Sequence, residues 1–300
     1  MKRALSVCLF VLATAVISSA QSTTLYFPHV VNGLLSGSNV WKTSIFLTNP
    51  AAANASNATV TITFTQQNAT LSGAGSAFPI ALVDQNGAAI PGSGGSTVSF
   101  QIAGGQTEVL ISTGGGAYAA GFATITSNQP VSGTAVFSEF DATGTHLIEE
   151  AGVPAGAAVP HQSIFVDTVG GYNIGVAFAN PSATASATVT LSLFNTSGAQ
   201  VATTTGIVGP GNHDAAFTSQ FFTTFTTPLA GTMEILSGAT TPLAAIALRF
   251  DPTFAIFTTL PPVTIASLFN PTIEWLGHSH WLSAFSSLAH LLVPLNARIG

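Results

Sequence analysis

The feature that most constrains this chain is a pattern that occurs twice. Residues 174–201 read IGVAFANPSATASATVTLSLFNTSGAQV, two apolar runs joined through Asn180-Pro181 and closed by a turn at residues 195–198. An earlier version, TSIFLTNPAAANASNATVTITF, occupies residues 43–64. Recurrence of one pattern along a chain predicts that one supersecondary plan is used more than once.

Alternation inside the pattern indicates β-strands. In residues 59–64, Val60, Ile62 and Phe64 fall on one face and threonines fall on the other. Strict alternation of this kind is typical of a half-buried strand in an antiparallel sheet. Short runs of similar character, separated by Gly, Asn, Asp and Pro turns, predict further strands at residues 43–47, 97–102, 108–112, 121–126 and 131–140. The sequence therefore predicts an all-β fold of antiparallel sandwiches.

Landmarks of the first copy recur in the second, which predicts two tandem immunoglobulin-like domains, residues 21–155 and 156–263. The paired landmarks are Asn49-Pro50 with Asn180-Pro181, Pro28-His29 with Pro160-His161, Gly105 with Gly211, and Phe140-Asp141 with Phe250-Asp251. The offset between the copies falls in the later pairs because the first copy carries a Gly/Ser/Ala-rich insertion at residues 66–77. One helix is predicted at residues 214–224, with Asp214 as its N-cap and phenylalanines 217, 221 and 222 facing inward.

The two ends of the chain differ from this plan. A basic start, an apolar run and the small residues Ser18-Ser19-Ala20 predict a cleaved signal peptide over residues 1–20, and hence a secreted or cell-surface protein. Cys8 lies inside that segment, so the mature chain would have no disulfide and no thiolate. Residues 264–300 form a tail of uncertain structure with helical spacing of apolar residues from Trp281 onward. After Ala20 no uncharged apolar run reaches the roughly 18 residues of a membrane span.

Charge excludes one class of partner. Charged residues make up 5% of the chain, against about 25% in ordinary domains. Beyond Lys2 and Arg3 the basic residues are Lys42, Arg249 and Arg298, against 11 acidic residues. Nucleic-acid binding needs lysine and arginine to contact phosphates, so it is not expected. A hydrophobic content of 47% with 21 phenylalanines is instead typical of a chain that builds cores.

A family resemblance rests on the second copy. The segments GVAFANP, TVTLSLFNTSG, GPGNHDAAF and PLAAIALRFD resemble an uncharacterised repeat of secreted bacterial proteins, and the resemblance covers roughly residues 26–262. Proteins of that kind resemble immunoglobulin- or fibronectin-like sandwiches in tandem, sometimes attached to larger surface proteins. The resemblance implies a binding or structural module and supplies no catalytic residues.

Catalytic and metal-binding patterns are weak. No Gly-x-Ser-x-Gly elbow is present. His213-Asp214 are adjacent residues that usually point apart, and they fit a turn and a helix cap. Glu149-Glu150 would form an acid/base pair only if the fold brought a partner to them; otherwise they are a solvated connection. His278 and His280 lack a third metal ligand nearby. The sequence therefore predicts no enzyme, no cofactor and no metal site.

Two aromatic residues are the candidate ligand contacts. Trp41 and Tyr172 stand just before an early strand in each copy, where an exposed ring would stack on a sugar and a buried one would close the end of the core. His29 and His161 are equivalent, which predicts a shared structural role. The leading interpretation is a secreted structural, adhesive or protein-interaction module. A carbohydrate-binding module that uses Trp41 and Tyr172 on an extracellular polysaccharide is the alternative, and a hydrolase assembled from distant residues is the third.

The scarcity of cations also bears on partners. Sheet edges are commonly guarded by lysine, proline, bulges or a covering segment. Between residues 21 and 262 the basic residues are Lys42 and Arg249, so charge does not guard the edges in general. Edges that are not covered by a neighbouring domain or the tail remain open for pairing. The sequence therefore predicts self-association, or binding of an extended partner, through an edge strand.

Overall fold

A computed structural model describes residues 23–35, 39–222, 224–225 and 228–266. Within them the fold is all-β, with antiparallel pairing of its strands, as predicted. The predicted signal peptide lies outside the described residues, as does all but the first part of the predicted tail. The strands belong to one compact unit that ends at Ile265.

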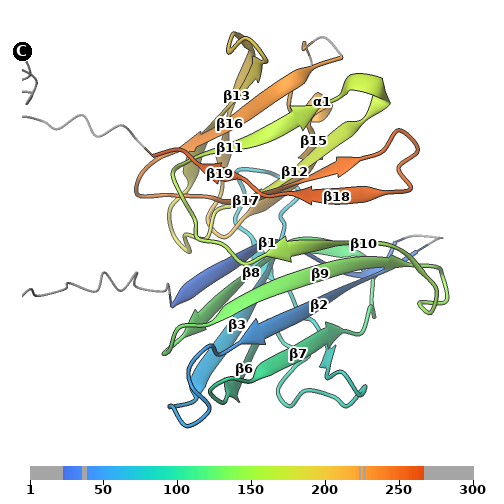
Figure 1. Ribbon diagram of the computed structural model, residues 1–300, viewed down its shortest axis with the longest axis vertical. Helices are drawn as coiled ribbons and strands as arrows, with labels where there is room; N and C mark the ends of the chain where they lie inside the picture. Colours follow the sequence, from blue (N-terminus) through green and yellow to red (C-terminus); the bar gives the residue numbers. More distant parts are fainter. Residues whose placement is uncertain (1–22, 36–38, 223, 226–227, 267–300) are drawn as a thin grey trace, which may run out of the picture. The chain divides into compact units, whose positions relative to one another are not determined.

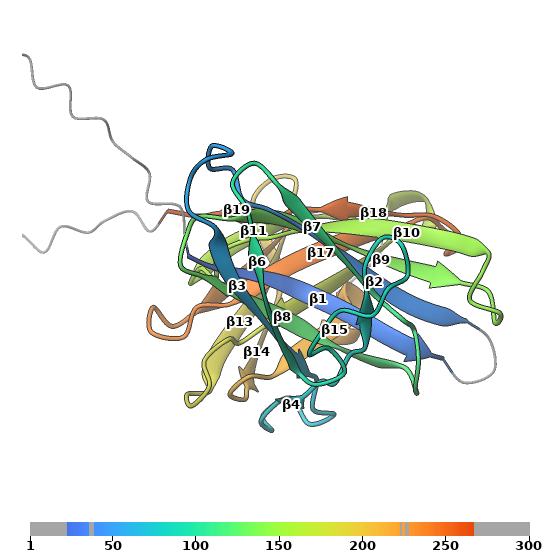
Figure 2. The same cartoon turned by 90° about the horizontal axis from the view of Figure 1, so that it is seen from below.

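Strands β1–β10, here called the first half, form two sheets (Figures 1 and 2). One sheet has the order β1-β8-β3-β6, with β4 beside the end of β3: β1 (Thr24–Leu34), β8 (Ala119–Ser127), β3 (Ala58–Gln66), β6 (Thr97–Ile102) and β4 (Ser76–Ala77). The other has the order β10-β9-β2-β7-β5: β10 (Leu147–Pro154), β9 (Ser132–Phe140), β2 (Val40–Thr48), β7 (Thr107–Ser112) and β5 (Leu82–Val83). The end of β1 crosses over to pair with β2.

Strands β11–β19, the second half, also form two sheets. One has the order β14-β13-β16-β11-β19: β14 (Gln200–Val208), β13 (Ala187–Asn195), β16 (Ala230–Ser237), β11 (His161–Asp167) and β19 (Val263–Thr264). The other has the order β15-β12-β17-β18: β15 (His213–Phe217), β12 (Asn173–Ala179), β17 (Ala244–Phe250) and β18 (Phe257–Leu260). A 3-10 turn, η1 (Val169–Gly171), precedes β12, and a helical turn, α1 (Thr218–Phe221), follows β15.

The order of the strands is the same in both halves. The order β6-β3-β8-β1 corresponds to β14-β13-β16-β11, and β7-β2-β9-β10 corresponds to β15-β12-β17-β18. Asn49 and Asn180, both fully buried, hold equivalent corners. The Asn49 amide donates to the Ile102 carbonyl at 3.0 Å, and the Asn180 amide donates to the Val208 carbonyl at 3.1 Å. Each asparagine thereby fixes the end of β6 or β14 to the loop that follows β2 or β12.

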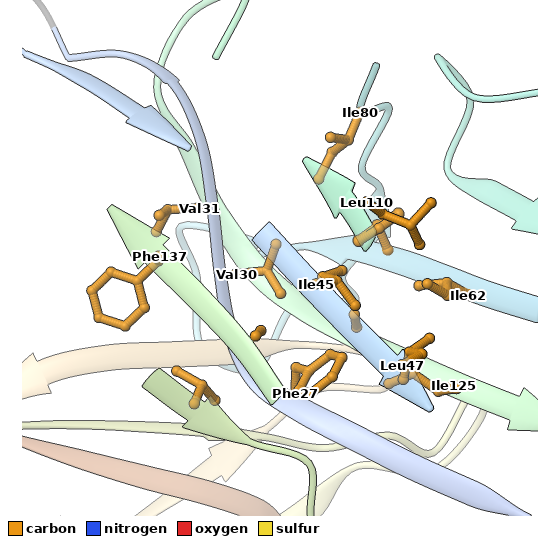
Figure 3. Packing of buried hydrophobic residues seen from close by; sticks show 14 of the residues in the cluster. Phe27, Val30, Val31, Ile45, Leu47, Ile62, Ile80, Leu110, Ile125 and Phe137 are labelled. Carbon is orange, nitrogen blue, oxygen red and sulfur yellow. The ribbon is translucent and has the colours of Figure 1, made fainter. Parts of the chain in front are cut away.

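Alternation along the strands sets the two cores. Val60, Ile62 and Phe64 of β3 are buried, and the threonines between them face outward, as the sequence predicts. Figure 3 shows the first core, where Phe27 and Val30 of β1 lie among Ile45, Leu47 and Ile125 from both sheets. The second core contains Ile174, Val176 and Phe178 of β12 against side chains of β13 and β16.

The first core extends into the second half. Ile246 and Leu248 of β17, Ala177 of β12 and Phe257 of β18 belong to the same cluster as the first-half residues. The rings of Phe137 and Phe257 stack with centroids 5.6 Å apart. The sheet β15-β12-β17-β18 therefore buries one face in its own half and the other against the first half. The predicted boundary between residues 155 and 156 falls in the connection between β10 and β11.

The predicted insertion joins the halves. Residues 67–75, between β3 and β4, lie against the second half, where Leu71 packs on the second core. Asn212 is fully buried; its amide donates to the Leu71 and Thr70 carbonyls at 2.8 and 3.1 Å, and its carbonyl accepts the Asn68 N–H at 2.8 Å. Here we call residues 67–75 the clasp loop. The insertion is thus an inter-half contact.

The predicted helix at residues 214–224 is wrong in extent. Residues 213–217 form β15, and Asp214 pairs with Phe178 of β12 instead of capping a helix. Of the described residues in this range, 218–221 are helical, and the Gln220 side chain caps this turn by accepting the Phe217 N–H at 2.7 Å. Pairing with β12 satisfies the backbone of residues 213–217 and competes with helix formation there. Phe221 and Phe222 pack on the second core as expected, whereas Phe217 does not.

Candidate functional site

A cavity of about 420 Å³ lies where the β10-β9-β2 sheet faces the β15-β12-β17-β18 sheet. Its wall is formed by both halves and is rich in aromatic rings: His29, Trp41, Tyr118 and Phe137 from the first half, and Phe217, Phe250, Phe254 and Phe257 from the second. Cavities that bind small molecules have this size and this apolar character, with a few polar groups in the wall.

Edge-to-face contacts hold the rings around the cavity. Trp41 packs against Tyr118 with ring centroids 6.2 Å apart, and Phe217 packs against Phe250 at 5.3 Å. Phe254 contacts the rings of both Phe217 and Phe250, at 5.6 and 5.9 Å. Offset and edge contacts of this kind are the favoured arrangements of aromatic pairs. The wall is therefore a continuous network that leaves an open volume.

Phe254 has a strained backbone. Its φ is +58°, in the left-handed region that residues other than glycine rarely adopt. The corresponding turn of the first half, which begins at Asp141 as this one begins at Asp251, has Gly144 at this point with φ +70°. Strain of this kind costs about 1 kcal/mol and concentrates at functional sites. The chain thus keeps an aromatic ring at the cavity in a position that suits glycine.

Three polar residues stand in register beside these rings. Trp41 of β2 pairs with Glu139 of β9, and Glu139 pairs with Glu149 of β10. Because residues directly opposite each other on neighbouring strands share a face, the indole and the two carboxyl groups form one row across the sheet. The Asn39 amide donates a hydrogen bond to Glu139. The fold therefore brings to Glu149 the carboxyl partner that the sequence left open.

The Glu149 carboxyl group is protonated at neutral pH. Burial raises the pKa of Glu149 to about 8, and its hydrogen bond with Glu139 and the nearby charges of Glu139 and Asp251 act in the same direction. A carboxyl that cannot ionise beside another carboxylate stays protonated and donates to it. The row therefore contains a carboxyl group, that of Glu149, which keeps its proton at neutral pH and can donate a hydrogen bond.

The row also carries polar atoms without partners. The indole Nε1 of Trp41 and the Oε2 of Glu149 are buried and make no hydrogen bond to the described residues. Leaving a buried polar atom unsatisfied costs about 1–3 kcal/mol, and such atoms call for an explanation. Both residues line the cavity. A bound molecule with hydroxyl groups could accept from the indole N–H and donate to the carboxyl oxygen.

A histidine pair, with His213 fully buried and His29 partly buried, closes the inner side of the site. His29 Nδ1 lies 3.2 Å from His213 Nε2, and His213 Nδ1 lies 3.1 Å from the Gln67 carbonyl oxygen. Burial lowers the pKa of His29 to about 4 and that of His213 well below its usual value. Both rings are therefore neutral at pH 7. Equivalent His161 instead contacts Glu234 at 3.0 Å, so the expectation of a shared role for the two histidines is wrong.

The predicted ligand contacts lie apart. Trp41 is partly buried in the cavity wall. Tyr172 precedes β12 outside that wall, and the Arg249 guanidinium lies 3.4 Å above its ring centroid. Arg249 is held there by an ion pair of 2.7 Å with Asp167. The structure therefore does not bring Trp41 and Tyr172 into one platform.

Sequence reasoning missed several residues of the site. Glu139 and the phenylalanines of the second half gave no local signal, because only strand register and packing bring them to Trp41. His213 and Asp214, adjacent in β15, do not act on each other, since His213 is paired with His29 and Gln67. No cluster of three metal-ligating side chains occurs among the residues that the structure describes. His278 and His280 lie outside them.

Comparisons with known proteins found no match to a family model, a curated protein or a solved structure. In the described part of the chain, no helix is long and apolar enough to cross a membrane.

Proposed function

We propose that the chain is an exported, non-catalytic binding protein of two tandem immunoglobulin-like sandwiches, with its ligand in the cavity between them. The observation that carries this proposal is the pair of unpartnered buried atoms, Trp41 Nε1 and Glu149 Oε2, beside an aromatic cavity. A ligand that bonds to both atoms would remove their desolvation cost. Phe254, whose backbone is strained at positive φ, places its ring in the same wall and supports the proposal.

The wall favours a neutral saccharide. Aromatic rings offer apolar faces to the C–H groups of a sugar ring, while the indole N–H and the carboxyl oxygens suit its hydroxyl groups. No lysine or arginine lines the cavity among the described residues, and Glu139 supplies a negative charge, so anionic ligands are disfavoured. A volume of about 420 Å³ is at the scale of a disaccharide-sized molecule.

The carboxyl pair suits binding better than hydrolysis. Glycosidases place their two carboxyl groups roughly 5 Å or more apart so that the sugar and a nucleophile fit between them. Glu139 and Glu149 instead bond directly to each other. They offer a ligand a fixed edge of carboxyl oxygens.

Export and the tandem arrangement have their own support. Residues 1–20 have the composition of a signal peptide, and the two halves share strand order and the Asn49 and Asn180 corners. The resemblance to secreted bacterial repeats points in the same direction. A purely structural or adhesive role at the cell surface is the second candidate, favoured by the shared core and the clasp loop, which join the halves as a rigid spacer.

Saccharide binding should depend on the indole N–H. Calorimetric titration with cellobiose, maltose, lactose and diacetylchitobiose is expected to show binding of at least one, and Trp41→Phe should weaken that binding about tenfold, as for one lost hydrogen bond. Tyr172 lies outside the cavity, so the Tyr172→Phe variant should bind the sugar with wild-type affinity. If none of the four sugars binds, or if Trp41→Phe binds as tightly as the wild type, the saccharide proposal is wrong and the structural role remains. Release of cleaved sugar would favour the hydrolase.

Phe254→Gly separates binding from folding. Glycine adopts the positive φ without strain, which offsets the loss of a ring that is 49% exposed. We expect the free energy of unfolding to change by less than about 1 kcal/mol, while affinity for the bound sugar falls severalfold. Chemical denaturation and titration measure the two effects. Gly144→Ala, at the matching turn of the first half, is the control and should leave binding unchanged.

A further inference from the structure

Strand β14 is an open sheet edge. Among the strands that the structure describes, it pairs only with β13, so one side of its backbone has no strand partner. Its nine residues, QVATTTGIV, include no charge and no proline. Edges of this length normally carry such guards, because unpaired N–H and C=O groups are a template for another chain.

Other edges are shorter or covered. The equivalent strand β6 has six residues. Strand β10 lies beside β18, where the Thr259 hydroxyl donates to the Gly152 carbonyl. The clasp loop reaches the far end of β14, where the Gly209 N–H donates to the Leu71 carbonyl at 2.9 Å. Residues 200–207 are thus the longest stretch of free edge in the described part.

The outward side chains of β14 are self-complementary. Thr203 and Thr205 face outward, bonded to Ser192 and Thr190 of β13, while Val201 and Ile207 are 43% and 51% exposed. In an antiparallel pair with a second β14, related by a two-fold axis at Thr204, Val201 lies opposite Ile207 and Thr203 opposite Thr205. Apolar pairs then flank threonine pairs, which are favourable cross-strand combinations.

We propose that a second copy of this chain pairs with it through β14, antiparallel, so that the five-stranded sheets of the two copies become continuous. The contact is isologous, with the same patch on both copies, and it closes as a dimer. It is independent of the proposed ligand site, because β14 belongs to the other sheet of the second half. Backbone hydrogen bonds and apolar burial hold it, so salt should change it little.

Charge exchange on two outward residues tests the pairing and its register. Thr203→Lys with Thr205→Lys places like charges directly opposite each other across the two-fold axis and should weaken dimerisation at least about tenfold. Thr203→Glu with Thr205→Lys places opposite charges there and should keep the dimer. Sedimentation equilibrium of the purified full chain, over a concentration series at low and high salt, measures both.

The control adds the same charges to the corresponding edge. Ser99→Lys with Gln101→Lys, on the outward face of β6, should leave the dimer intact. All four positions are outside the cores, so each variant should fold. Circular dichroism checks this. A wild-type chain that stays monomeric, or a dimer that survives the two lysines on β14, would overturn the proposal. A dimer lost equally in both charge variants of β14 would overturn the register.

Discussion

Replacement of Asn212 by alanine should lower the free energy of unfolding by about 3 kcal/mol. The side chain is fully buried, and its amide and carbonyl satisfy the Thr70 and Leu71 carbonyls and the Asn68 N–H of the clasp loop. Alanine leaves those groups buried without partners. Because the clasp loop also places Leu71 on the second core, the loss should loosen both halves.

The first half offers a matched control for Asn212. Gln106 holds the same place after β6 that Asn212 holds after β14, since the Asn49 N–H donates to the Gln106 carbonyl and the Asn180 N–H to the Asn212 carbonyl. The Gln106 side chain is exposed, so Gln106→Ala should change stability by no more than about 0.5 kcal/mol. Urea denaturation compares the two. Equal stabilities of Asn212→Ala and Gln106→Ala would show that the hydrogen bonds between Asn212 and the clasp loop contribute nothing to stability.

Stability should pass through a maximum near pH 6.5, with a fall on both sides. His29 and His213 have lowered pKa values in the folded chain, against about 6.5 when exposed. The unfolded state therefore binds more protons as the pH falls below 6.5, and stability is lost on the acid side. For His29, with a folded pKa of about 4, the loss is about 3 kcal/mol.

Glu149 causes the loss of stability on the alkaline side of the maximum. Its folded pKa of about 8 is raised above 4.5, so the folded state holds a proton that the unfolded state releases. That contribution is fully present below pH 4.5 and is lost as the pH rises through 8. Between pH 4.5 and 6.5 the two histidines outweigh the single carboxyl group. Between pH 6.5 and 8 the histidine contributions are complete, and the raised pKa of Glu149 sets the slope.

Calorimetric melting temperatures at pH 5, 6.5 and 8.5 measure both sides. Glu149→Gln keeps a hydrogen-bond donor to Glu139 but cannot ionise, so it should abolish the fall between pH 6.5 and 8.5. It should also steepen the fall from pH 6.5 to 5, because the carboxyl group no longer opposes the two histidines there. Glu150→Gln, on the exposed neighbour, should keep the wild-type profile. A flat wild-type profile above pH 6.5 would mean that Glu149 is ionised in the folded chain.

Local pattern was enough to predict the strands. In β3 and β13 alternating side chains are buried on one face and polar on the other, so the period of two gives the strand and its inner face together. Turn residues such as Asn195 and Gly198 gave the hairpin between β13 and β14, where the Asn195 side chain accepts from the Ala199 N–H. Such features depend on neighbours in sequence.

The sequence indicated the face buried between the two halves less clearly. Strand β17, AAIALRF, is almost continuously apolar, and strands buried on both faces read this way. Ile246 and Leu248 face the first half, while Ala245 and Ala247 face the second core. The predicted helix failed for a related reason: the choice between helix and strand at residues 214–217 was decided by pairing with β12, which lies far away in sequence.

The site itself was beyond local reasoning. Trp41, Glu139 and Glu149 are neighbours only because β2, β9 and β10 pair in one register. A shift of one residue would turn one of these side chains to the other face. The length and composition of the insertion at residues 66–77 did not indicate which part of the fold it contacts. Its contact with Asn212 could therefore not be predicted.

The position of the clasp loop in the chain also bears on the order in which the two halves fold. A chain that is synthesised or exported from its N-terminus presents Leu71 long before the strands of the second core, which span residues 161–264. The first half can therefore complete its sheets and offer a finished docking surface, with apolar side chains such as Phe137 exposed, while the rest emerges. We expect the second half then to fold onto a template already in place, with the aromatic cavity forming last.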